Sequence, residues 1–224
     1  MTPELLARLQ AARTGLRPVV LLTRLSDGEQ RLWPQDALPG ALADAAQQAL
    51  NTDRTAQFAL DGEDWFLQPH NPPLRLIIVG AVHAGQALAP LGAAMGFAVT
   101  VIDPRGSFAT SERFPGVTLH HDWPDEAMTA LAPDARTAIV TLTHDPKLDD
   151  PALDVALRSP AFYVGALGSK RTHAKRVERL TELGHDAAAI ARIAAPVGLD
   201  IGAVTAPEIA LSIIAQIVAR RRNK

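Results

Sequence analysis

The feature that most constrains the fold is a short aliphatic run that leads into a glycine-containing turn. Residues 74–79 (Leu-Arg-Leu-Ile-Ile-Val) precede Gly80 and Gly85, and a helical pattern follows. A buried parallel strand enters the first helix of a dinucleotide-binding unit in this way. The next aliphatic run, residues 98–102, ends in Asp103, about 20 residues past the glycines, where such folds hold a ribose hydroxyl. Residues 74–103 are therefore predicted to form a β-α-β unit.

The glycine motif departs from the dinucleotide-binding fingerprint at its middle position. The fingerprint G-x-G-x-x-G would place a glycine where this chain has Val82. The middle glycine lets the backbone approach a pyrophosphate, and a β-branched valine restricts both the local turn and that approach. Gly80 still allows the tight turn, and Gly85 allows close helix–strand packing. We expect poor binding of ordinary NAD; alternatively, Gly80 and Gly85 are only turn and packing glycines.

Downstream of this unit, aliphatic runs alternate with helical patterns. Strands are predicted at residues 117–120, 137–142, 161–164 and 193–196, and helices at residues 125–131, 151–157, 170–183 and from 205 onward. This alternation indicates a parallel, doubly wound sheet. We expect strand order 3-2-1-4-5, which the last short strand can extend. Ligands of such sheets bind beyond the carboxyl ends of the strands, where the strand order reverses.

The first 70 residues have a different pattern. They predict two helices and two hairpins, at residues 3–14, 18–33, 38–50 and 56–68, and three prolines follow within residues 69–73. The hairpin at 56–68 turns at Asp61-Gly62, which is a strong hairpin signal. The fold class is therefore α/β, a Rossmann-like doubly wound parallel sheet (residues 71–224) preceded by a small α+β N-terminal subdomain (residues 1–70).

Composition excludes several classes of function. The chain has 224 residues, a net charge of −2 and no cysteine. Without a basic field, no nucleic-acid partner is expected. Disulfides, thiolate metal sites and a persulfide carried on this chain are excluded. No apolar run reaches the roughly 20 residues of a membrane span, and the first residues lack a secretion signal, so we expect a cytoplasmic protein.

A second glycine-containing loop predicts an anion site. Gly165 and Gly168 precede Ser169, which can cap a helix that begins with Lys170 and Arg171. Free backbone N–H groups, the helix dipole and two cations all favour an anion there. The alternative is a capped helix with a solvated basic face, because basic residues continue along it.

Polar residues follow the other predicted strands as well. Asp103 favours NAD over NADP, although Arg105 could accommodate a 2′-phosphate. His83 lies in the glycine turn and would face a ligand. His144 and Asp145 could supply a general base, a metal ligand or a polar contact to a heterocycle; alternatively, Asp145 caps a turn and His144 is only hydrogen-bonded. We predict no metal site, because these residues lie on one loop without a second ligand group.

Several segments carry a common signature when they are taken together. They are residues 78–83 (Ile-Val-Gly-Ala-Val-His), 103–105 (Asp-Pro-Arg), 113–115 (Arg-Phe-Pro), 143–149 (Thr-His-Asp-Pro-Lys-Leu-Asp), 163–171 (Tyr-Val-Gly-Ala-Leu-Gly-Ser-Lys-Arg), 195–202 (Ala-Pro-Val-Gly-Leu-Asp-Ile-Gly) and 207–210 (Pro-Glu-Ile-Ala). From about Pro72 onward the chain resembles the XdhC/CoxI family, the accessory factors of xanthine dehydrogenase and related molybdenum hydroxylases.

The resemblance implies a maturation factor rather than an enzyme. Members of this family have a C-terminal Rossmann domain and are implicated in binding molybdenum cofactor (molybdopterin), assisting its sulfuration and delivering it to an apo molybdenum hydroxylase. Longer relatives carry an N-terminal domain with a Gly-Gly-Cys segment, which residues 1–70 lack. The sulfur donor would then be a separate cysteine desulfurase. The expected cofactor-binding residues are Gly80, Val82, His83, Gly85, Asp103, Arg105, His144, Asp145, Gly165, Gly168, Ser169, Lys170 and Arg171.

Two other interpretations of the sequence stay open at this point. One is an NAD(P)-dependent oxidoreductase, and the other is an interaction module that kept the fold without the ligand. The client enzyme, the mononucleotide or dinucleotide form of the cofactor, any catalytic activity and the oligomeric state, including a homodimer, are not determined by the sequence.

The predicted anion site gives a first test. Arg171→Ala should weaken a phosphate-bearing ligand by about 1.5–3 kcal/mol, the usual worth of a charge-assisted hydrogen bond. Titration calorimetry measures the affinity, and circular dichroism checks that the variant keeps its fold. Equal affinity for the two proteins would remove Arg171 from the site.

Overall fold

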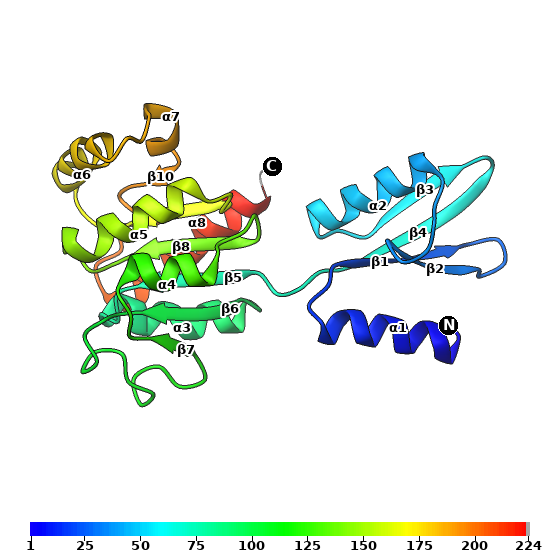
Figure 1. Cartoon of the computed structure of the whole chain (residues 1–224), viewed down its shortest axis with the longest axis horizontal. Helices are drawn as coiled ribbons and strands as arrows, with labels where there is room; N and C mark the ends of the chain where they lie inside the picture. The colour runs from blue at the N-terminus through cyan, green and yellow to red at the C-terminus, as the bar shows by residue number, and fades with distance from the viewer. Residues whose placement is uncertain (223–224) are drawn as a thin grey trace. The chain divides into compact units, whose positions relative to one another are not determined.

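The computed structural model describes residues 1–222 and divides the chain into two compact units (Figure 1). The first unit is Met1–Pro72 and the second begins at Pro73. Within the described residues, each unit contains its own hydrophobic core clusters, and none is shared between the two. Each is therefore described by itself.

The first unit is a four-stranded antiparallel sheet with a helix on each face. Val19 and Leu21 pack with one helix, and Val20 and Leu22 pack with the other, because side chains alternate along a strand. The strand order is β2-β1-β4-β3. The elements are α1 (Pro3–Thr14), β1 (Val19–Arg24), β2 (Gln30–Trp33), α2 (Gly40–Thr52), β3 (Ala56–Leu60) and β4 (Glu63–His70).

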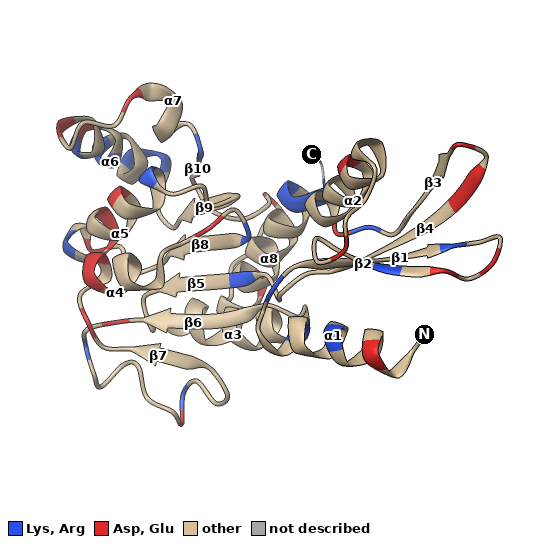
Figure 2. Cartoon of the chain, turned by 45° about the vertical axis from the view of Figure 1, so that its right-hand side comes forward, with Lys and Arg blue, Asp and Glu red and all other residues tan. Residues whose placement is uncertain are grey.

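The second unit is a six-stranded parallel sheet in the order β10-β9-β8-β5-β6-β7. Numbered from β5, this order is 3-2-1-4-5 with the short last strand added, so the predicted topology is confirmed. Figure 2 shows β5, β6 and β8 pointing the same way. The elements are β5 (Arg75–Val79), α3 (His83–Ala94), β6 (Ala98–Ile102), β7 (Thr118–His120), α4 (Pro124–Leu131), β8 (Thr137–Thr141), α5 (Pro146–Arg158), β9 (Tyr163–Ala166), α6 (Lys170–Glu182), α7 (Ala187–Ile190), β10 (Ile193–Ala194) and α8 (Ala206–Arg222).

Helices cover both faces of the parallel sheet. The core with α3 and α8 includes Ile78 and Val140, whereas the core with α4, α5 and α6 includes Ile77 and Ile139. Strand β5 lies between β6 and β8, with Ile78 opposite both Val101 and Val140. The strand order therefore reverses between β5 and β8, which is where doubly wound sheets bind ligands.

One predicted helix begins elsewhere in the structure, and one observed helix was not predicted. The helix expected at 151–157 begins at Pro146, since Asp145 caps it by accepting the Lys147 N–H at 3.0 Å. Pro151, which was interpreted as a helix start, lies inside this helix. Helix α7 was not predicted, because four residues are too few to show a helical period.

Close packing of α3 on the turn after β5 requires Gly85. A Cβ atom at Gly85 would lie 2.6 Å from the Gly80 carbonyl oxygen and 3.4 Å from Ile78 Cγ2. The first of these distances is far inside van der Waals contact with a backbone atom, so the helix or the turn would have to move.

We expect Gly85→Ala to destabilise the chain, because overpacking usually costs about 1–3 kcal/mol. The higher helix propensity of alanine offsets roughly 1 kcal/mol of this cost. Urea unfolding followed by circular dichroism measures this. Gly106→Ala is the control, because nothing lies within 4 Å of its Cβ position. Equal stability of the two variants would contradict the close approach.

Candidate functional site

The loops that follow neighbouring strands touch at the carboxyl edge of the parallel sheet. Gly80, directly after β5, has φ +112, and a Cβ there would lie 2.7 Å from Thr143 Cγ2, in the loop after β8. The Ala81 N–H donates to Asp103 Oδ2, directly after β6, at 2.7 Å. The sheet thus brings together three of the segments that the sequence singled out.

The side chain of Asp103 is completely engaged within the chain. Arg105 donates to both carboxylate oxygens, from Nε to Oδ1 at 2.8 Å and from Nη2 to Oδ2 at 2.7 Å. The Asp103 side chain is 0% exposed. Burial alone would raise the pKa of Asp103, but hydrogen bonds from Arg105 and Ala81 outweigh burial and leave this pKa below its usual value. A ribose hydroxyl would have to displace Arg105, so the ribose role stays a prediction.

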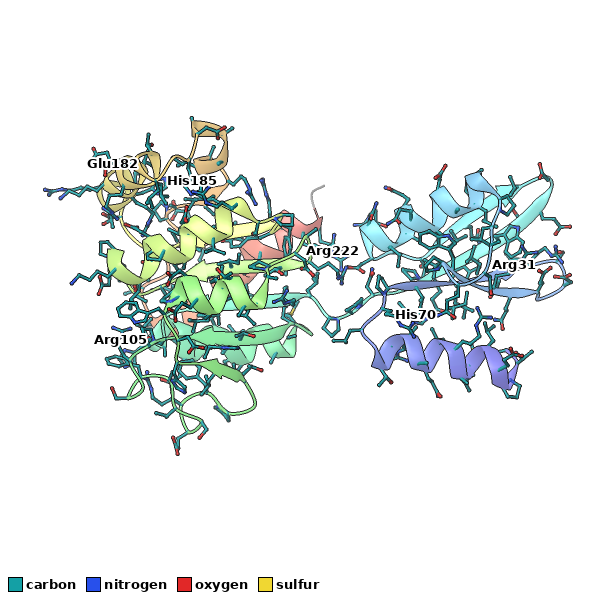
Figure 3. The ribbon with its side chains drawn as sticks, in the orientation of Figure 1. Arg31, His70, Arg105, Glu182, His185 and Arg222 are labelled. Atoms are coloured by element: carbon teal, nitrogen blue, oxygen red, sulfur yellow. The ribbon has the colours of Figure 1, made fainter. Side chains whose placement is uncertain are left out.

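Arg105 also stacks on an aromatic ring. Its guanidinium carbon lies 4.4 Å from the centre of the Phe108 ring, and Figure 3 labels Arg105 near the end of β6. On the same loop, Arg113 donates to the Phe108 carbonyl at 2.6 Å and to Gln86 Oε1 in α3 at 3.4 Å. The loop after β6 therefore presents two guanidinium groups around one exposed phenylalanine, beside the start of α3. The sequence had indicated Arg113 only through the family resemblance.

Val82 precedes helix α3 in an ordinary extended conformation. Its φ and ψ are −87° and 175°, which valine adopts without strain, and the positive φ of the turn belongs to Gly80. Part of the Val82 side chain packs on the core. The start of α3 has no side-chain cap and no acidic residue in its first turn, and His83 is exposed there. Whether Val82 hinders a pyrophosphate stays a prediction.

The loop between β9 and α6 is built as the sequence predicted. Gly168 has φ +137, and Ser169 caps α6 by accepting the Thr172 N–H at 3.1 Å. A Cβ at Gly165 would lie 2.6 Å from Val197 Cγ2, which makes this glycine a packing requirement. Lys170 and Arg171 are exposed, and Figure 2 shows basic residues along α6. Their exposure places any anion contact at the surface, where solvent screens it.

The loop after β8 uses Asp145 for structure. Asp145 is the residue that caps α5, and His144 before it is exposed with φ +61. This agrees with the capping alternative. Among residues 1–222, no group of three or more His, Asp or Glu side chains converges in a way that could hold a metal ion.

Sequence reasoning missed the residues Asp149 and Arg176 as members of this site. Asp149, in the first turn of α5, accepts the Thr143 hydroxyl at 2.7 Å, and Arg176 of α6 donates to the Leu167 carbonyl at 3.0 Å. Burial raises the pKa of Asp149 and lowers that of Arg176. The capping residue Asp145 was the available signal, since a helix starting there places Asp149 one turn later, on the same edge.

A family model described as the XdhC Rossmann domain matches residues 76–217. The chain belongs to the XdhC family. The match covers β5 to the last turns of α8 and confirms the resemblance inferred from the sequence segments.

Three known proteins are similar to this XdhC-family chain. The molybdenum cofactor insertion chaperone PaoD of Escherichia coli K12 is 35% identical over 153 residues, 68% of this chain and 42% of PaoD. A probable xanthine dehydrogenase subunit of Bacillus subtilis 168 is 34% identical over 159 residues, 70% of this chain and 46% of that protein. The solved xanthine dehydrogenase of Bacillus halodurans has a TM-score of 0.73 at 23% identity, covering 99% of this chain and 65% of that one; this likeness shows the fold.

The alignments span less than half the length of the two curated relatives. Within residues 1–222 of this XdhC-family chain, no helix has the length and hydrophobicity needed to cross a membrane.

The Asp103–Arg105 pair gives a pH-dependent test. The pKa of Asp103 is lower in the folded chain than in the unfolded chain, where it is about 3.9. The pair therefore stabilises the folded chain at pH values above the unfolded pKa. This stabilisation is lost as the pH falls through the folded-state pKa of Asp103. Asp103→Asn should therefore cost about 1–3 kcal/mol near neutral pH, and the difference from wild type should shrink below about pH 4.

Urea unfolding at several pH values measures this difference. Asp27→Asn is the control, because Asp27 forms a comparable pair with Arg24 at a solvent-exposed position, where ion pairs contribute little. A cost of Asp103→Asn that is the same at every pH would contradict the charged pair.

Proposed function

We propose that this chain is a maturation factor that binds molybdenum cofactor and assists its insertion into an apo molybdenum hydroxylase of the xanthine dehydrogenase type. Membership of the XdhC family supports the proposal, as does the similarity to a protein named as a molybdenum cofactor insertion chaperone. The matched region covers less than half of each curated relative. The identity of the client enzyme is therefore itself proposed.

The observation that favours this function over ordinary NAD binding is the occupied carboxylate of Asp103. In a standard dinucleotide site this acid accepts ribose hydroxyls. Here Arg105 and Ala81 already use its oxygens, and Val82 stands at the position of close pyrophosphate approach. A ligand held mainly by the loops after β8 and β9 avoids both obstacles.

The residues at the carboxyl edge fit a heterocycle that carries a phosphate. Lys170 and Arg171 are exposed at the start of α6 and would hold the phosphate or pyrophosphate end. His83, His144 and Arg105 would line the remainder of the ligand. The molybdenum centre is chemistry that the bound cofactor supplies, and the chain's part is to bind the organic portion and orient it.

Sulfuration would need a second protein. The chain has no cysteine, and a thiolate is the group that carries persulfide sulfur. We therefore propose that a cysteine desulfurase delivers sulfur to the cofactor while this chain holds it. Association as a homodimer is compatible with such a carrier.

An NAD-dependent oxidoreductase is the competing function, favoured by the position of Asp103 at the end of β6. It requires Arg105 to leave the carboxylate on binding. The two functions differ in which ligand the purified chain retains.

We expect wild-type chain, expressed in a host that makes molybdenum cofactor, to retain pterin through gel filtration and to lose NAD. Pterin fluorescence after oxidation and metal analysis measure the retained cofactor, and titration calorimetry measures NAD binding. Val82→Gly should strengthen NAD binding, because it opens the backbone to a pyrophosphate. Micromolar NAD affinity together with an absence of retained pterin would refute the proposed function.

A further inference from the structure

A buried ion pair at the carboxyl edge of the sheet is only half satisfied. The side chains of Asp149 and Arg176 are each 2% exposed, and Arg176 Nη2 lies 3.8 Å from Asp149 Oδ2. A charge-assisted hydrogen bond would be about 2.7–2.9 Å long. Within residues 1–222, Asp149 Oδ2 and the Nε and Nη1 atoms of Arg176 have no hydrogen-bond partner. Buried polar atoms are nearly always paired, so these three call for a missing partner.

Another unpaired atom lies on the same side of the sheet. Thr141 Oγ1 is buried and has no hydrogen-bond partner in the described chain. Thr141 ends β8 and shares its face with Ile139, which packs in the core formed with α5 and α6. Asp149 and Arg176 belong to those two helices. The unpaired atoms of Thr141, Asp149 and Arg176 therefore lie on the side of the sheet that α5 and α6 cover.

The unpaired atoms themselves disfavour an anion as the missing partner. Arg176 Nε and Nη1 are donors, but the unpaired Asp149 Oδ2 is a carboxylate oxygen of the same ion pair and would repel a phosphate. A neutral group that both donates and accepts hydrogen bonds would satisfy both residues.

We propose that Asp149 and Arg176 bind the amide-like edge of a heterocyclic ligand, in which a ring N–H lies beside a ring carbonyl. The ring N–H donates to Asp149 Oδ2, and Arg176 Nε or Nη1 donates to the carbonyl oxygen. Pterin and guanine rings both present this edge. The inference rests on the proposed function and deepens it: the pterin ring lies inward at the pair, and the phosphate lies outward at Lys170 and Arg171.

A short piece of loop covers the pair. Arg176 Nη2 donates to the Leu167 carbonyl at 3.0 Å, and a Cβ at Gly168 would lie 3.8 Å from the same nitrogen. Gly168 has φ +137, a conformation that glycine adopts without strain. The Leu167 carbonyl occupies Nη2 only, so Nε and Nη1 stay available to the ring carbonyl.

The test is titration of the full chain with three ligands: free pterin, followed by fluorescence, and guanosine and adenosine, followed by calorimetry. Adenosine lacks the N–H and carbonyl edge. We expect pterin and guanosine to bind and adenosine not to bind. Asp149→Asn replaces the free acceptor with a donor, and should weaken both ligands about ten- to a hundredfold. Asp149→Asn keeps an oxygen for the Thr143 hydrogen bonds, so the variant should fold.

Arg176→Lys is a second variant, since it keeps the charge but removes the planar donors; it should also weaken binding. Asp150→Asn is the matched control, because it breaks the neighbouring pair with Arg179 and should leave affinity unchanged. Circular dichroism and thermal unfolding check each variant.

Equal affinity of wild type and Asp149→Asn for pterin and guanosine would overturn the inference, as would the absence of binding to wild type. If wild type retains molybdenum cofactor on co-expression and Asp149→Asn retains it equally, the inference fails and the proposed function stands. If pterin and guanosine bind through Asp149 but no cofactor is retained, the proposed function fails and the inference stands.

Discussion

The carboxylate of Asp103 holds together the loops on which the candidate site depends. It accepts the Ala81 N–H, from the turn after β5, and three N–H groups of Arg105 (backbone, Nε and Nη2), from the loop after β6. One buried acid therefore fixes two neighbouring βα loops, and it also fixes the guanidinium that stacks on Phe108. In a standard dinucleotide site the acid at this position is available to the ligand. Here it organises the protein, so a ligand that used this carboxylate would have to displace Arg105.

Charge is divided between the interior and the surface of the carboxyl edge. Inside, Arg176 lies 3.8 Å from Asp149, and burial raises the pKa of Asp149 and lowers that of Arg176. Outside, Lys170, Arg171 and Lys175 are exposed on α6 and contribute a positive field that salt screens. A ligand with a neutral ring and a charged tail matches this division, whereas a ligand with its phosphates at the centre of the edge does not.

Strand order could be predicted because it follows from local pattern and general chain topology, both visible in the sequence. The ends of β5, β6, β8 and β9 fall within a few residues of their predicted places. The start of α5 could not be predicted, since Pro151 resembles a first-turn proline and hides the true cap, Asp145. Asp149 and Arg176 were missed for a related reason. Their roles come from burial and from a contact between α5 and α6, and the two residues are 27 positions apart in the sequence.

A half-satisfied buried ion pair is costly for the free chain. Both charges lose hydration, and partners 3.8 Å apart regain only part of that loss. Well-packed apolar residues of similar volume often stabilise a protein at least as well as such a pair, so stability alone does not account for it. A ligand that completes the missing hydrogen bonds binds only the folded chain and stabilises it by mass action. The cost in the free chain is therefore the consequence of keeping a donor and an acceptor ready, side by side, at the carboxyl edge of the sheet.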